Sequence, residues 1–278
     1  MNARKKPQIT TEVVTITPTL AQEWLEVNRN NRTPRKTHVA RLARDMAEGR
    51  WKMTGEAIAF DSEGNLQNGQ HRLMAIIEAA VKVPMLVVRG VPPESFDVID
   101  QGSVRTTGDA LRALGIPDPS LIGAASRLVL MYEQYPDKSW NSVNQKLTKT
   151  EITTYAEQHA PGLVLAEAAS RHWHFGRSRY SATVAGGYLL HRKHGGSEAF
   201  TAFSEGLVTG ADLPKNSPVL ALRNYIINSN NGRRASLDRW SQQKMVFAIV
   251  KAWNYYLEDN AVDHLRVTPS SLPMPEVR

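Results

Sequence analysis

The chain of 278 residues contains no cysteine. This absence excludes disulfide bonds, thiolate zinc sites, iron–sulfur clusters and cysteine nucleophiles together. No run approaches the roughly 18 consecutive apolar residues of a membrane-spanning helix. The basic first residues lead into no apolar stretch of the secretory type. We therefore expect a cytoplasmic protein that has no membrane partner.

Four common functional motifs are missing as well. The sequence contains neither GxxxxGKS/T nor GxGxxG, which excludes a P-loop and a Rossmann fingerprint. It also contains neither HExxH nor GxSxG, the motifs of zinc peptidases and of α/β-hydrolases. Any chemistry must therefore come from a less common arrangement of residues.

Positive charge is in excess. Lys and Arg number 34 against 27 Asp and Glu, which gives a net charge of +7 at pH 7. Residues 1–60 alone carry 11 basic and 6 acidic residues, and residues 171–194 carry five Lys or Arg, four His and no acidic residue. Such clusters are typical of a surface that faces phosphate groups, although each is also compatible with an ordinary solvated face.

Hydrophobic spacing predicts a compact α+β unit up to about residue 90, in the order β-α-α-β-β-α-β. Its elements are strand 12–17, helix 19–27 with Thr19 as N-cap, helix 37–48, strand 57–60, short strand 66–67, helix 70–80 and a buried strand 83–89. Residues 61–65 predict the turn of a hairpin.

After about residue 106 the patterns are helical and no strand is predicted. The expected helices are 107–114, 119–134, 149–158, 162–172, 181–194, 197–206, 217–228 and 237–257. The pair Gly186-Gly187 weakens the prediction for the fifth of these. Residues 268–278 contain three prolines and are expected to be irregular. We predict an α+β domain over residues 1–106 and an all-α domain over residues 107–278.

The most informative local feature is the segment Asn68–Ala75, with the sequence NGQHRLMA. A glycine between a strand and a helix lets the backbone approach a ligand, and the amides of the helix start attract anions. Arg72 adds a planar charged group suited to phosphate oxygens, and His71 can exchange a proton near neutral pH. These residues predict a phosphate cradle; the alternative is a helix N-cap followed by a surface arginine.

This segment resembles the GERRxxA box of the ParB/sulfiredoxin superfamily, in its DGQHRxxA variant. The resemblance extends over roughly residues 10–110. It includes the Asn-rich loop 28–35, helix 37–48 with the following Gly49, the hairpin 57–65 and strand 83–88. The members that it resembles most are phage-encoded or prophage proteins with a helical second half, which implies a bacterial or phage-infected host cell.

The resemblance implies a ParB/sulfiredoxin-like N-terminal domain that binds a nucleoside triphosphate with Mg²⁺. The phosphate ligands that it implies are Gly69, Gln70, His71, Arg72, Arg105, Arg32 and Arg35. The resemblance also implies that Gln70, His71 and Asp100 are catalytic residues and that Asp100 and Gln101 bind a metal ion. Homodimers are common in the family, so a homodimer is one expectation. Sulfiredoxin activity itself is excluded, because its chemistry needs a cysteine in the box.

DNA is the expected macromolecular partner. The basic candidates for DNA contact are Arg41, Arg44, Arg171, Arg177 and Arg179. Trp173, Phe175 and Tyr180 could stack on bases, although a core position is the better interpretation of Trp173. Two histidines, His172 and His174, are too few for a closed zinc site. No persuasive helix-turn-helix is present, and its one candidate is helix 181–194.

We therefore expect a nucleotide-binding protein that is a slow NTPase and acts with or on DNA. The first alternative is a metal-dependent DNA endonuclease with Asp61, Asp97 or Asp100 on the metal ion, although Asp61 and Glu63 also fit solvated turn positions. The second is a non-catalytic DNA-binding regulatory protein. A role beside an enzyme of phage DNA modification is a further alternative.

Overall fold

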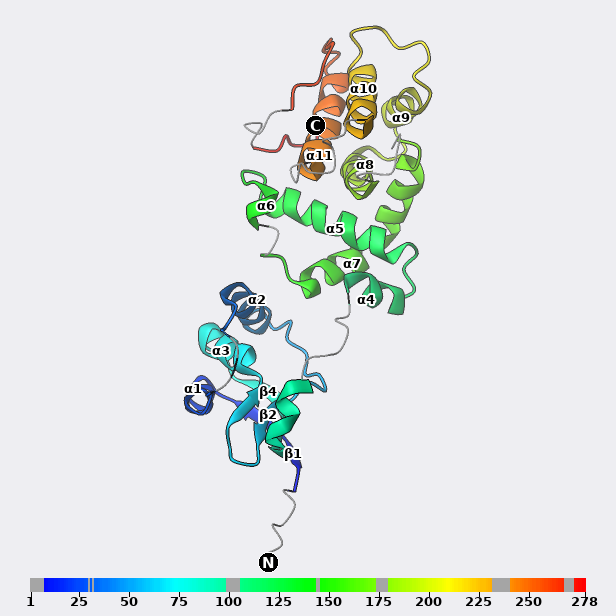
Figure 1. The fold of residues 1–278 in the computed structure, drawn as a ribbon. Helices are drawn as coiled ribbons and strands as arrows, with labels where there is room; N and C mark the ends of the chain where they lie inside the picture. Colours follow the sequence, from blue (N-terminus) through cyan, green and yellow to red (C-terminus); the bar gives the residue numbers. More distant parts are fainter. Residues whose placement is uncertain are drawn as a thin grey trace, which may run out of the picture. The chain divides into compact units, whose positions relative to one another are not determined.

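A computed structural model of the chain describes residues 8–29, 31, 33–98, 106–143, 146–173, 180–231, 241–267 and 273–278. The chain divides into two units, residues 1–104 and 105–278 (Figure 1). The fold is mixed α+β, and the described strands all lie in the first unit. None of the described helices combines the length and apolar character that a bilayer-spanning segment requires.

A four-stranded mixed sheet forms the base of the N-terminal unit. Its strands are β1 (Thr10–Ile16), β2 (Ile58–Asp61), β3 (Leu66–Asn68) and β4 (Val83–Val91), in the spatial order β1-β4-β2-β3. Strand β4 runs antiparallel to β1 and parallel to β2, while β2 and β3 form an antiparallel hairpin. The β-α-α-β-β-α-β order predicted from the sequence is confirmed.

Three helices lie on one side of this sheet (Figure 1). They are α1 (Pro18–Glu26), α2 (Lys36–Ala47) and α3 (Gln70–Ala79), and α3 contacts both of the others. Their apolar faces and one face of the sheet form a shared core that includes Met46, Ile58 and Leu73. A 3₁₀ helix, Pro93–Val98, follows β4 and was not predicted.

Two local predictions for this unit are wrong. The N-cap of α1 is Thr17, whose hydroxyl accepts a hydrogen bond from the amide of Leu20, and not Thr19. Pro18 therefore occupies the first helical turn, where its missing N–H costs nothing. Strand β4 is buried on one face only: Val83, Met85 and Val87 are buried, whereas the residues between them are more exposed, because the helices cover only one side of the sheet.

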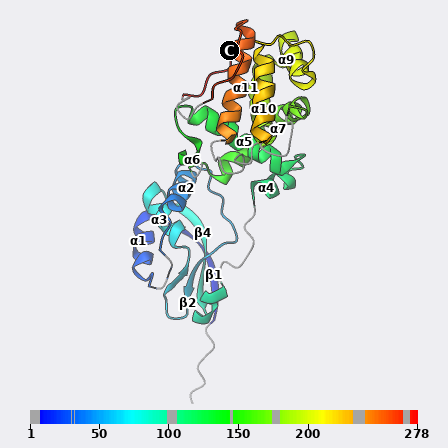
Figure 2. The same ribbon diagram turned by 45° about the horizontal axis from the view of Figure 1, so that its top comes forward.

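In the described part of the second unit, all regular secondary structure is helical. Its helices are α4 (Thr107–Ala113), α5 (Pro119–Gln134), α6 (Trp140–Val143), α7 (Lys149–Ser170), α8 (Tyr180–His194), α9 (Glu198–Thr209), α10 (Pro218–Asn231) and α11 (Ser241–Leu257). Figure 2 shows α10 and α11 side by side. Helix α8 packs against α5, α7 and α11, and its residues 182–190 are all buried. A helix buried in this way cannot read a DNA groove.

Two predictions for this unit are corrected by the structure. The expected helices 149–158 and 162–172 form one helix, α7, with Pro161 inside it. The paired glycines of α8 do not interrupt that helix, because they lie where neighbouring elements come closest. A Cβ atom on Gly186 would lie 2.7 Å from Ile249 Cδ1, and one on Gly187 would lie 3.0 Å from Ser170 Cβ. Close helix packing therefore explains both glycines.

We predict that Gly186→Ala destabilises the protein although alanine favours helices. The steric cost of an overpacked core is about 1–3 kcal/mol, and the gain in helix propensity is about 1 kcal/mol. Chemical denaturation followed by circular dichroism measures the difference. Ile249→Val removes the atom nearest to the new methyl group, so the double variant should be more stable than the sum of the two single changes. Simple additivity would contradict the packing account.

Candidate phosphate-binding site

The turn between β3 and α3 depends on a glycine. Gly69 has φ of +107° and is the N-cap of α3. A Cβ atom there would lie 2.4 Å from Ile58 Cδ1, so both the backbone conformation and the available space require glycine. The amides of Arg72 and Leu73 donate to the carbonyl of Gly69 at 2.9 and 3.0 Å. The turn thus fixes the start of α3, and a helix start carries partial positive charge.

The Asn-rich loop, residues 28–35, is attached to this turn by side-chain amides. Asn28 Nδ2 donates to Gln70 Oε1 at 3.2 Å. Asn31 Nδ2 donates to Asn28 Oδ1 at 2.6 Å and to the carbonyl of Leu66 at 2.7 Å. The amide of Leu66 in turn donates to the carbonyl of Val27 at 3.1 Å. These bonds hold the loop against the end of β3 and the first residue of α3.

His71 forms the second attachment of the loop. Its Nε2 atom accepts a hydrogen bond from the backbone N–H of Arg35 at 3.1 Å, so this nitrogen carries no proton in the arrangement observed. The ring of His38 lies edge-on, with its centroid 5.2 Å from that of His71. Both Gln70 and His71 are buried, at 4% and 8% exposure. Their observed contacts position the loop, and their predicted catalytic roles stay predictions.

Arg72 is buried, so the alternative of a surface arginine is wrong. Only 8% of the residue is exposed. Its guanidinium donates to the carbonyl of Glu56 through Nη1 and to the carbonyl of Ala57 through Nη2, the latter at 2.9 Å. Arg72 therefore fixes the segment that leads into β2. Its predicted phosphate contact stays a prediction, and the structure adds this second role.

Three exposed cations lie in the Asn-rich loop or directly after it. Arg29, Arg35 and Lys36 are exposed, and none of them forms an ion pair within the described part of the chain. Arg41 and Arg44, on α2, are half-buried, and the Nε atom of Arg41 is shielded from solvent without a hydrogen-bond partner. The backbone N–H of Arg35 is bonded to His71, so the chain segment that carries Arg35 and Lys36 lies next to the start of α3.

Several predicted site residues lie outside the described residues. These are Arg32, Asp100, Gln101, Arg105, Arg177 and Arg179, together with His174 and Phe175. The second half of the predicted pocket and its metal ligands are therefore among them.

Of the three carboxylates considered for a nuclease, the structure describes the side chain of Asp61, whereas Asp100 and the side chain of Asp97 lie outside what it describes. Asp61 is buried rather than solvated, which corrects the prediction for this residue. Its Oδ1 accepts from the amides of Glu63 and Asn65 at 2.9 and 2.8 Å, so the carboxylate stabilises the hairpin turn. Among the residues described, no group of three or more His, Asp or Glu side chains could hold a metal ion.

In the second basic stretch, residues 171–194, several of the described side chains form contacts within the helical unit. Arg171 pairs with the buried Glu167, with Nη2 to Oε2 at 3.0 Å, and Tyr180 also donates to Glu167. Burial, reinforced by this carboxylate, raises the pKa of Tyr180 to about 12. Trp173 is fully buried and donates through Nε1 to Ser204 Oγ at 3.0 Å, which confirms its core interpretation. A DNA contact by Arg171 stays a prediction.

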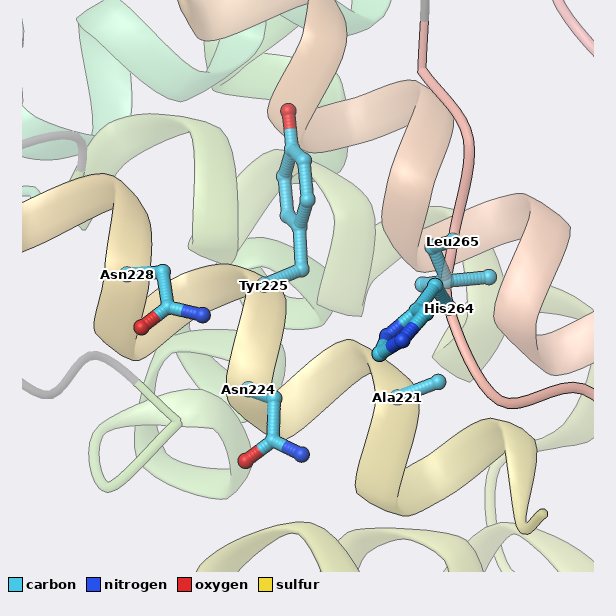
Figure 3. Close-up of a pocket in the computed structure, with 6 residues that line it drawn as sticks. All are labelled: Ala221, Asn224, Tyr225, Asn228, His264 and Leu265. Carbon is cyan, nitrogen blue, oxygen red and sulfur yellow. The ribbon is translucent and has the colours of Figure 1, made fainter.

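The helical unit contains a pocket that no sequence pattern predicted. This pocket has a volume of about 330 Å³ and lies between α10 and the segment after α11. Figure 3 shows the carboxamides of Asn224 and Asn228 on α10, with His264 and Leu265 on the other segment. Asn224, Asn228 and His264 are exposed. Its wall combines distant segments, which is why no local motif marks it.

No protein-family model, curated protein or solved structure matches this chain. The assignment to the ParB/sulfiredoxin superfamily therefore stays an interpretation of the motifs around residues 68–75.

We predict that Arg72→Ala destabilises the N-terminal unit by about 2 kcal/mol or more, because it removes two charge-assisted hydrogen bonds to backbone carbonyls. Urea denaturation followed by tryptophan fluorescence measures this loss. Lys82→Ala, an exposed change just beyond the opposite end of α3, is the control and should leave stability unchanged. Unchanged stability of Arg72→Ala would contradict its structural role.

Proposed function

We propose that the N-terminal unit binds a nucleoside triphosphate at the turn formed by Gly69 and the Asn-rich loop. One observation carries the proposal: hydrogen bonds from Asn28 and Arg35 join the loop to the first two residues of α3. They bring the loop that carries the exposed Arg29 and Arg35 to the start of a helix, and both cations and a helix start attract phosphate groups. The resemblance of NGQHRLMA to a nucleotide-binding box supports the same function.

In this proposal the chain acts mainly by electrostatics. The backbone at the start of α3 and the exposed Arg35 and Lys36 would offset the negative charge of the phosphates. Gln70 and His71 would keep the loop in place, because their side chains are already engaged with it. A bound Mg²⁺ would supply further charge neutralisation. The described residues hold no ligand set for that ion, so we assign it no protein ligand.

We further propose that hydrolysis is slow and that the protein acts with DNA. A site that binds by fixed amides and cations, and whose His71 is engaged with the backbone of Arg35, favours slow turnover. The run of basic residues along α2, which contains Lys36, Arg41 and Arg44, is the DNA-facing surface in this proposal. The nuclease alternative has no comparable support among the described residues, because Asp61 is committed to its turn.

We predict saturable binding of CTP, ATP or GTP in the presence of Mg²⁺, measured by isothermal titration calorimetry. Arg35→Ala should weaken binding about tenfold, because it removes one exposed cation without removing the backbone N–H that binds His71. Lys82→Ala removes one exposed cation at the other end of α3 and should bind as the parent does. No binding of any triphosphate would contradict the proposal and favour the pure DNA-binding alternative.

DNA binding is predicted to weaken as salt increases, because contacts to phosphates release counterions. Fluorescence anisotropy with a labelled duplex gives the slope of log K against log salt. Lys36→Ala should reduce that slope by about one, and Lys82→Ala should leave it unchanged. A salt-independent affinity, or equal slopes for all three proteins, would contradict the assignment of this surface.

A further inference from the structure

We propose that α5, α8 and α11 form a binding groove for an extended peptide, and that residues 274–278 of the chain occupy it in this structure. We call this surface the tail groove. Its walls are Tyr132 on α5, Lys193 and His194 on α8, and Trp253 and Asn254 on α11. This function is separate from the nucleotide site of the N-terminal unit.

The tail groove forms hydrogen bonds with the main chain of every residue from 275 to 278. The carbonyls of Pro275, Glu276 and Val277 accept from Tyr132 Oη, Asn254 Nδ2 and Lys193 Nζ at 2.6, 2.7 and 2.7 Å. The carbonyl of Arg278 accepts from Trp253 Nε1 at 3.3 Å and from His194 Nε2. At the other end, the amide of Met274 donates to the carbonyl of Pro136 at 2.7 Å.

Asn254 makes the most specific of these contacts. Its Nδ2 donates to the carbonyl of Glu276, and its Oδ1 accepts from the amide of Arg278 at 3.0 Å. One carboxamide thus pairs with the peptide backbone as a neighbouring β-strand would. Burial raises the pKa of Tyr132 to about 12, so its hydroxyl remains a donor throughout the neutral range. These contacts recognise the amides and carbonyls of an extended backbone.

Only one side chain of the bound segment is deeply buried. Met274 is 4% exposed, whereas Pro275 and Val277 are half-buried and Glu276 and Arg278 are exposed. The segment is therefore held by one apolar anchor, by its backbone and by an ion pair between Arg278 and Glu258. An extended segment with an unbranched apolar residue at the anchor position and a basic residue four positions later meets the same requirements.

The bound segment also leaves part of the groove unfilled. A cavity of about 300 Å³ remains beside Val277, lined by Tyr132, Leu189, Arg192 and Lys193. Arg192 is paired with Glu133, while Lys193 contacts the carbonyl of Val277. A larger acidic side chain at the Val277 position would occupy this space and add a charge-assisted hydrogen bond. We therefore assign to the groove a peptide with an apolar anchor and, three residues later, an acidic residue.

The test uses the full chain and fluorescein-labelled peptides with the sequence of residues 271–278. In the parent protein the attached segment competes at an effective concentration near the millimolar range, so a free peptide should bind weakly. Met274→Asp places a charge at the anchor position and should release the segment. The free peptide should then bind this variant at least about tenfold more tightly than it binds the parent, as measured by fluorescence anisotropy. The Val277→Glu peptide should bind about tenfold more tightly still.

A matched pair of substitutions separates the groove from general effects. Asn254→Ala, added to Met274→Asp, should weaken peptide binding about tenfold or more, because two backbone hydrogen bonds are lost. Asn228→Ala, on the exposed face of α10, should have no effect. Circular dichroism establishes that each variant is folded, and Met274→Ala replaces Met274→Asp if the latter is not. Failure of either peptide to bind a folded variant, or equal effects of the two asparagine substitutions, would overturn the proposal.

Discussion

The N-terminal unit depends on the left-handed backbone of Gly69. That conformation lets β3 end and α3 begin within a single residue, at a point where a side chain would collide with Ile58. Because α3 starts there, Gln70 and His71 face the Asn-rich loop and hold it by hydrogen bonds. The positions of the loop, of its cations and of the segment fixed by Arg72 all follow from this one turn. The proposed nucleotide site is therefore a consequence of how the unit folds.

Local patterns in the sequence predicted the elements well and the side-chain environments less well. The helix at 119–134 and the order of elements in the first unit follow from hydrophobic spacing, which records the buried face of each element. Arg72 and Asp61 show the limit. Both were assigned to solvent or ligand from their charge, yet both are buried against backbone groups that lie elsewhere in the chain. Such partners are tertiary, so no local pattern identifies them.

The helical unit shows the same limit in another form. The low helix propensity of Gly186 and Gly187 weakened the prediction of a helix there. In the structure these glycines permit the close approach of α11 and α7 to α8. Residues 273–278 were correctly expected to lack regular structure, and their prolines gave no sign that they lie in a groove. Their binding depends on side chains that are between about 20 and 140 residues away in the sequence, such as Asn254 and Tyr132. The candidate peptide-binding groove of the helical unit can therefore be identified from the structure and not from the sequence.

Hydrogen–deuterium exchange with and without a nucleoside triphosphate and Mg²⁺ tests the central claim most directly. The claim is that the Asn-rich loop and the start of α3 form one phosphate-binding site. The account predicts that the nucleotide slows exchange in residues 28–36 and 69–73 together and leaves α8 and α11 unchanged. Protection confined to the helical unit, or absence of protection at both segments, would contradict it.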